Sequence, residues 1–120
     1  MAIRGIRGAT QIDSDDAGLM KEAVVELMSE IIRANALTVE DLISVFFTVT
    51  TDIRSDFPAA SARAMGLGDV PLICSTEIPV PGSLPRTIRA LVHCQTDRSQ
   101  KQIAHIYLRG TAVLRKDLAQ

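Results

Sequence analysis

The sequence predicts an α+β domain of the α/β-like kind, in which a mixed β-sheet packs on one side against a long amphipathic helix and a short helix. Three observations predict it: a strand-like opening segment, one helical stripe of apolar residues, and several later runs rich in β-branched residues. Their order, β-α-β-α-β-β-β, is typical of a sheet with helices on one side. The 120 residues are expected to form a single domain over residues 1–120.

The composition limits the partners and the compartment. A hydrophobic content of 47% without tryptophan indicates either an apolar monomer core or extra burial at a subunit interface. The net charge of −1 argues against nucleic-acid partners, and no apolar run approaches the ~18 residues of a membrane span. Cys74 and Cys94 do not form a disulfide or metal framework, and the chain starts without a signal-peptide pattern. We therefore expect a cytoplasmic protein with no metal site and no membrane partner.

Residues 2–10 are expected to form the first strand, because apolar and charged side chains are interleaved there. Arg7 is the most informative residue in this segment. Its guanidinium is either a solvated charge at a sheet edge or an anion ligand held by the sheet. Gly5 and Gly8 favour the anion ligand, since glycine often stands where another group approaches the backbone closely.

An amphipathic helix follows the first strand. Residues 14–16 supply an N-cap candidate and acidic side chains for the helix N-terminus. Apolar residues then recur at helical spacing, and Asn35 is the expected stop. The apolar stripe comprises Met20, Val24, Leu27, Met28 and Ile31.

The middle of the chain predicts a capped turn, a strand and a short helix. Residues 38–41 resemble a capped helical turn, and residues 42–50 are rich in the β-branched and aromatic side chains of a buried strand. Pro58 suits the first turn of a helix that runs to Ala64, and Gly66 is its expected stop.

Further extended segments are predicted in the second half of the chain. Residues 70–74 form the third strand, and the proline-rich residues 79–85 form an irregular connection to a fourth strand over residues 87–95. Residues 103–108 and 111–114 are shorter extended candidates.

Arg89 lies within the fourth predicted strand. Because side chains alternate along a strand, it shares a face with Leu91 and His93. At a sheet edge its guanidinium would reach water along the aliphatic stem. In the interior of the sheet it would be a desolvated cation that binds an anion strongly.

Few residues suit covalent or metal catalysis. Cys74 would need a base to act as a nucleophile, and the spacing places neither His93 nor His105 beside it. The sequence contains no Gly-rich phosphate loop, HExxH or GxSxG motif. Glu77 is either a simple loop carboxylate or an acceptor for a ligand hydroxyl. Tyr107, the single tyrosine, would by itself be a half-buried ring with a solvated hydroxyl.

Several motifs together resemble the small trimeric class of chorismate mutases, over essentially all 120 residues. No single motif is decisive, but their order and spacing along the chain are specific. They are Ile3-Arg4-Gly5-Ile6-Arg7-Gly8-Ala9-Thr10, Asp56-Phe57-Pro58-Ala59, Val70-Pro71 with Cys74 and Glu77, Gln95-Thr96-Asp97, and His105-Ile106-Tyr107-Leu108 followed by Ala112-Val113-Leu114-Arg115.

The resemblance implies a pseudo-α/β-barrel subunit, a homotrimer with active sites between subunits, and conversion of chorismate to prephenate without a cofactor. This reaction leads to phenylalanine and tyrosine. Arg89 would bond the ether oxygen whose C–O bond breaks, and would also hold a carboxylate. Arg7 and Tyr107 would bind a substrate carboxylate. Cys74 and Glu77 would contact the ring hydroxyl.

The same resemblance implies further residues around the substrate. Phe57 and Ala59 would come from the adjacent subunit, and Arg115 would lie on a C-terminal segment that closes over the substrate. The remaining pocket residues would be Leu72, Ile73 and Leu114.

The implied reaction agrees with the shortage of acid–base residues. A pericyclic rearrangement is unimolecular, so the enzyme must hold the dianionic substrate in a compact, chair-like shape. It must also stabilise the negative charge that develops on the ether oxygen. A guanidinium at Arg89 can do this, and lysine would not offer the same planar pair of donors.

The chain departs from the family pattern at two positions. Ala60 stands where a lysine is usual, which removes a cationic contact from the adjacent subunit. Arg63, one helical turn further on, is the candidate replacement. Ile73 stands where a threonine is usual, which matters little if only the backbone there touches the substrate. We expect activity to survive with weaker substrate binding.

Rival interpretations remain. A trimeric enamine/imine deaminase of the same general fold, or a small-carboxylate binder built on it, would also hold a carboxylate with arginine at a subunit cleft. A purely structural trimer would need no anion ligand. Two opposed carboxylates demand several cations, and the chain offers Arg7, Arg89, Arg115 and Arg63. This number favours a chorismate mutase.

Overall fold

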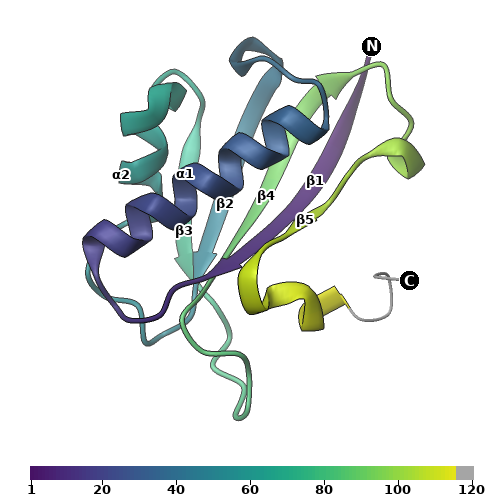
Figure 1. Ribbon diagram of the computed structural model, residues 1–120. Coiled ribbons are helices and arrows are strands. Elements are labelled where there is room, and N and C mark those ends of the chain that lie inside the picture. Colours follow the sequence, from purple (N-terminus) through teal and green to yellow (C-terminus); the bar gives the residue numbers. More distant parts are fainter. Residues whose placement is uncertain (116–120) are drawn as a thin grey trace.

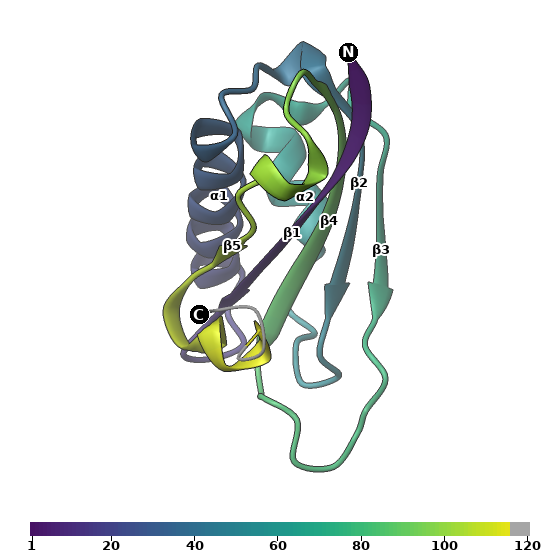
Figure 2. The same cartoon turned by 90° about the vertical axis from the view of Figure 1, so that its right-hand side faces the viewer.

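The computed structural model describes residues 1–115, which form a mixed five-stranded sheet in the order β3-β2-β4-β1-β5. The strands are β1 (Ala2–Gln11), β2 (Leu42–Val49), β3 (Leu72–Thr76), β4 (Thr87–Thr96) and β5 (Ile106–Tyr107). The helices α1 (Ala17–Ala34) and α2 (Pro58–Ala62) lie on one side of the sheet (Figure 1). Figure 2 shows the other face of the sheet without a helix on it. The predicted α+β fold class is confirmed.

The centre of the sheet is the antiparallel pairing of β1 with β4. It keeps one register from Ala2 opposite Thr96 to Gln11 opposite Thr87. β2 pairs antiparallel with the other side of β4, while β3 and β5 add parallel to β2 and β1. β4 is thus an interior strand, which excludes the edge position considered for Arg89.

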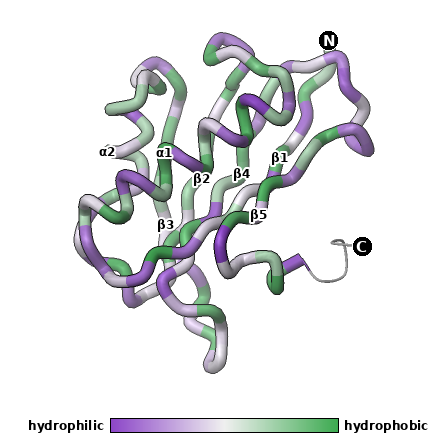
Figure 3. The backbone as a smooth tube through the Cα atoms, in the orientation of Figure 1, coloured by the Kyte–Doolittle hydropathy of each residue, from purple (hydrophilic) through white to green (hydrophobic). Residues whose placement is uncertain are grey.

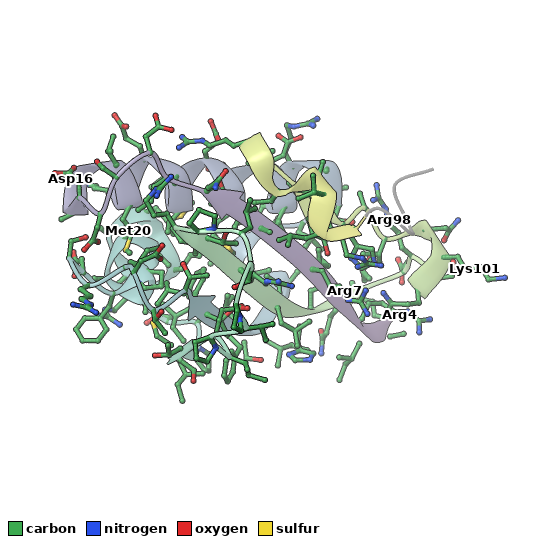
Figure 4. All side chains as sticks on the ribbon, turned by 90° about the horizontal axis from the view of Figure 1, so that it is seen from below. Arg4, Arg7, Asp16, Met20, Arg98 and Lys101 are labelled. Atoms are coloured by element: carbon green, nitrogen blue, oxygen red, sulfur yellow. The ribbon has the colours of Figure 1, made fainter. Side chains whose placement is uncertain are left out.

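The helix α1 is capped at the predicted residues. The Asp16 carboxylate accepts a hydrogen bond from a first-turn N–H (2.9 Å), and Asn35 follows the last turn. Figure 4 shows Asp16 near one end of α1 and Arg98 near the other. The buried face of α1 contains the predicted apolar stripe, and it packs closely on β1: a Cβ at Gly8 would stand 2.7 Å from Ile31 Cδ1. No helix within residues 1–115 is long and apolar enough to cross a membrane.

The second strand is not buried on both faces, contrary to the prediction. Val45 and Phe47 are buried, whereas Phe46 is 40% exposed on the uncovered side of the sheet. The alternation was hidden in the sequence because apolar residues occupy both faces. Figure 3 shows hydrophobic (green) and hydrophilic (purple) stretches that follow one another along the chain.

The segment between β2 and β3 also differs from the prediction. The α-helix ends at Ala62, and a π-helical turn, Arg63–Leu67, follows it, with Gly66 at φ 107° as the expected stop. The Val70 N–H donates back to the Leu67 carbonyl (3.1 Å), so the chain is still turning there. For this reason β3 begins at Leu72 instead of residue 70.

The extended segments expected near the C-terminus are largely wrong. Of these expected segments, only Ile106–Tyr107 is a strand, and it pairs with β1. Residues 111–114 lie in a 3₁₀ helix, Arg109–Arg115. Arg109 turns the chain with φ 56°. The Thr111 hydroxyl then donates to the Ala9 carbonyl (3.2 Å) and to the carbonyl three residues before it (2.7 Å). One local bond and one bond to β1 thus hold the chain in a turn despite its β-branched residues.

Asn35 joins the end of α1 to the segment that leads into β5. It is buried, its amide donates to the carbonyls of Ile31 (2.9 Å) and Ala104 (3.0 Å), and its Oδ1 accepts from the Ala104 N–H (2.8 Å). Arg98 donates to the Ala34 carbonyl (2.9 Å) beside it. The β4–β5 connection is therefore attached to the helix C-terminus.

Asn35→Ala should lower the free energy of unfolding by about 2–3 kcal/mol, because it leaves the part-buried backbone N–H and carbonyl of Ala104 without their side-chain partner. Urea unfolding monitored by circular dichroism measures the change. Ser29→Ala, on the exposed side of α1, is the control and should stay within about 0.5 kcal/mol. A loss as small as that for Asn35→Ala would show that these bonds do not stabilise the fold.

Candidate active site

The uncovered face of the sheet carries a cleft of about 230 Å³. Its polar and aromatic lining comes from four strands that are far apart in the sequence. It comprises Arg7 of β1, Phe46 and Thr48 of β2, Arg89 of β4 and Tyr107 of β5. The sheet therefore brings together three of the residues that the sequence indicated as anion ligands.

Strand register puts the two arginines of this cleft on one face. Arg7 is paired with Leu91, which is two residues from Arg89 along β4, so all three side chains point the same way. The Arg89 side chain is 44% exposed in the single chain. It is thus an interior-strand cation that still meets solvent, which is less desolvated than the sequence suggested.

Glu77 lies one residue beyond β3 and reaches Arg89 across β2. Its N–H donates to the Val49 carbonyl (2.8 Å), and its Oε2 stands 3.3 Å from the Arg89 Nε. The same carboxylate oxygen accepts a hydrogen bond from the Thr48 hydroxyl. Sequence reasoning missed Thr48. Its position two residues after Phe46, on the same face of the strand, is the signal that could have found it.

Tyr107 and Arg115 form a second pair beside the cleft. Arg115 Nη1 donates to the Tyr107 hydroxyl (3.0 Å), and its guanidinium carbon lies 5.6 Å from the ring centroid. The Arg115 residue is only 9% exposed, and Leu114 beside it is half-buried. The C-terminal 3₁₀ helix therefore brings a third guanidinium next to a cleft-lining side chain.

His105 is bound to the backbone of the first arginine. Its Nδ1 accepts a hydrogen bond from the Arg7 N–H (2.9 Å), which requires the ring to be unprotonated at that nitrogen. Desolvation, followed by the positive charges of Arg7 and Arg115, lowers the pKa of His105 below its ordinary 6.5. Burial thus disfavours the charged imidazole first, and the two nearby guanidiniums add to that effect.

The Cys74 side chain lies on the opposite face of β3 from the cleft. It is paired with Phe47 and packs, like Leu72, against the core beneath the helices. Cys74 also lines a second hollow of about 340 Å³, together with Phe57. The thiol of Cys74 and the carboxylate of Glu77 therefore do not converge. Ile73, which is 59% exposed, points away from this core.

The residues expected from an adjacent subunit lie outside the cleft of their own chain. Phe57 is 67% exposed, and Arg63 is exposed on the turn after α2. Ala59 is 5% exposed and belongs to the core, so its methyl group presents little surface to a ligand. Within residues 1–115 none of the three lines the cleft that contains Arg89.

The segment that carries Phe57 is held in place by Asp15, which follows β1 at the end of the sheet where β2 also ends. The Asp15 carboxylate accepts hydrogen bonds from the backbone N–H groups of Arg54 and Ser55, each at 3.0 Å. These bonds, led by that from the Arg54 backbone, lower the pKa of Asp15 below its ordinary 3.8. At neutral pH the Asp15 carboxylate is therefore charged. We call its hydrogen bonds to the Arg54 and Ser55 backbone the Asp15 clasp.

The functional groups of the cleft suit anion binding. Residues 1–115 contain no group of three or more His, Cys, Asp and Glu side chains that could hold a metal ion. The cleft is lined by two guanidiniums and one phenol, and the Glu77 carboxylate stands beside one of these guanidiniums. Such groups bind and orient a carboxylate-bearing ligand through charge-assisted hydrogen bonds.

Comparison with known proteins decides the family. The family model described as chorismate mutase type I matches residues 3–118. The chain belongs to the chorismate mutase type I family. A relative named chorismate mutase AroH from Thermus thermophilus is 45% identical over 117 residues, which cover 97% of this chain and 96% of that protein. Chorismate mutase AroH of Bacillus subtilis (strain 168) is 38% identical over 120 residues, covering 99% and 94%.

The fold agrees with a solved chorismate mutase. The structure of chorismate mutase from Clostridium thermocellum matches with a TM-score of 0.89 at 42% identity, covering 91% of this chain and 97% of that one. Membership of the chorismate mutase family confirms the resemblance that the motifs indicated. The deaminase interpretation is not favoured.

The His105 imidazole should titrate with a midpoint below pH 6.5 in ¹H NMR spectra, and Arg115→Ala should raise that midpoint because it removes one positive charge. Since the folded pKa is lower than the unfolded value, the contribution of neutral His105 to stability is complete above pH 6.5. It is lost as the pH falls through the folded pKa. A midpoint at or above 6.5 would contradict the arrangement.

Proposed function

We propose that this chain rearranges chorismate to prephenate in the cleft lined by Arg7, Arg89 and Tyr107. The observation that carries the proposal is the gathering of cations: two guanidiniums share one face of the sheet, and Arg115 adjoins Tyr107. A substrate with two carboxylates needs several cations. Membership of the chorismate mutase type I family supports the same reaction.

The reaction requires that the substrate be held in one conformation and that the charge developing on its ether oxygen be stabilised. The side chains of this cleft can do both. One C–O bond breaks as one C–C bond forms, so no proton, electron or leaving group is exchanged with the protein. Arg89 would donate to the ether oxygen as negative charge develops on it, while Arg7 and Tyr107 would hold a carboxylate. Glu77, beside Arg89, would accept a hydrogen bond from the ring hydroxyl. Cys74 would contribute there through its backbone, because its side chain packs against the core.

The proposal includes a homotrimer with sites between subunits. The uncovered face of the sheet carries exposed apolar side chains, and an apolar surface of this kind is commonly covered by another protein surface. The exposed apolar side chains on this face are Ile3, Phe46, Ile73 and Leu91, which are 63%, 40%, 59% and 41% exposed. Phe57 and Arg63 lie away from their own cleft, so they would serve that of a neighbour. A cytoplasmic setting would suit the free Cys74 and Cys94.

Arg89→Ala should lower kcat/KM for chorismate by roughly two to three decades, about 3–4 kcal/mol, because it removes a fixed donor to the ether oxygen. The loss of chorismate ultraviolet absorbance, with prephenate identified as product, measures it. Lys101→Ala, at an exposed residue beyond β4, is the control and should leave the rate unchanged. Full activity in Arg89→Ala would refute this role for Arg89. No turnover by the folded wild-type protein would favour the deaminase or binder interpretation.

Mixed assemblies test the shared sites. Phe57→Asp places a carboxylate against a dianionic substrate and should lose most of the activity, as should Arg89→Ala. Mixing the two variants, each with a different affinity tag, should restore activity, because some sites would combine an intact Arg89 with an intact Phe57. Two-step affinity purification isolates the mixed species, and light scattering should give three times the mass of the chain. Mixed trimers without restored activity would place each site within one chain.

A further inference from the structure

The Glu77 carboxylate is held at one oxygen by a hydrogen bond and by an ion pair. Its Oε2 accepts from the Thr48 hydroxyl and stands 3.3 Å from the Arg89 Nε. Thr48 and Arg89 are direct partners across β2 and β4, and Thr48 is also paired with Ser75 on the other side. The Thr48 side chain thus lies on the sheet between the acid and the arginine, at the edge of the cleft.

This arrangement affects how completely Glu77 neutralises Arg89. A carboxylate beside a guanidinium tends to form a bidentate pair, in which both oxygens contact parallel N–H groups. Such a pair would occupy guanidinium N–H groups of Arg89 that are needed to bind the substrate. A hydroxyl bond to Oε2 resists that rotation, because it fixes this oxygen beside the Arg89 Nε.

Resting on the proposed function, we propose that Thr48 is a positioning residue for the reaction. Its hydroxyl keeps the Glu77–Arg89 pair at a single point of contact. The Nη groups of Arg89 remain directed to the ether oxygen and carboxylate of the substrate, and Glu77 Oε1 remains directed to the ring hydroxyl. Thr48 itself touches neither bond that changes.

The proposal is tested with Thr48→Val, which keeps the shape and removes the donor, and with Thr48→Ser, which keeps the donor. Thr48→Val should lower kcat about tenfold to a hundredfold, the range for a hydrogen bond to a charged group, with a smaller change in KM. Thr48→Ser should stay within about threefold of the wild type. Ser44→Ala, on the same strand, is the control and should not change kcat. If Thr48→Val does not fold, as judged by circular dichroism, Thr48→Ala takes its place.

A second background separates positioning from general damage. In a Glu77→Ala background, Thr48→Val should have almost no further effect, because the hydroxyl then has no carboxylate to hold. An equal loss in both backgrounds, or wild-type kcat in Thr48→Val, would overturn the proposal.

A readout without substrate distinguishes this proposal from the proposed function. The ¹⁵N-detected Nε–H resonance of Arg89 should shift in Thr48→Val and stay in place in Thr48→Ser. An unchanged resonance in Thr48→Val would overturn the positioning role even if activity falls. If the wild-type protein does not convert chorismate while the resonance behaves as expected, the contact stands and the proposed function fails.

Discussion

The pairing of β1 with β4 is the constraint on which the rest of the structure depends. Ten consecutive residues of β1 are opposite ten of β4 without a bulge, so the positions of Arg7 and Arg89 relative to each other are set by the hydrogen-bond ladder. Strands in a sheet are spaced about 4.8 Å apart, and side chains alternate between faces. A slip of one residue would turn one guanidinium toward the helices. The backbone therefore sets the spacing of the charges.

One face of the sheet forms the packed core, and the other carries the cleft. The helix-covered face contains most of the buried apolar side chains, including Ile6, Phe47 and the stripe of α1. Burying each large side chain of this kind is worth about 1.5–3 kcal/mol, so most of the stability resides there. The opposite face carries Arg7, Arg89, Thr48 and the cleft. Substitutions at the cleft can change chemistry without disturbing the packed core.

Local signals in the sequence predicted the features that depend on local physics. The helix cap at Asp16, the stop at Asn35 and the shared face of Arg89 and Leu91 follow from capping and alternation, and all three are present. The interior position of β4 and the link between Thr48 and Glu77, 29 residues apart, depend on strand order. No periodicity in the sequence reports strand order, so these features required the structure.

Some errors arose where local and non-local preferences disagree. Residues 111–114 have strand-like composition, but the Thr111 hydroxyl bonds Ala9 and closes a turn instead. The family resemblance placed Cys74 and Glu77 together at the ring hydroxyl, whereas their odd spacing puts the two side chains on opposite faces of the sheet. The alternation of side chains along a strand already predicts that Cys74 and Glu77 point to opposite faces.

The Asp15 clasp has a consequence for how the protein can change over time. It holds the Arg54–Ser55 backbone, and thereby the approach to Phe57, with hydrogen bonds at the surface, whereas the flanking Ile53 packs into the core. Local opening of this segment and global unfolding consequently draw on different interactions. If Phe57 contributes to a neighbouring site as proposed, substitutions in this loop can alter substrate preference with little change in the melting temperature of the domain, so binding and stability can evolve separately.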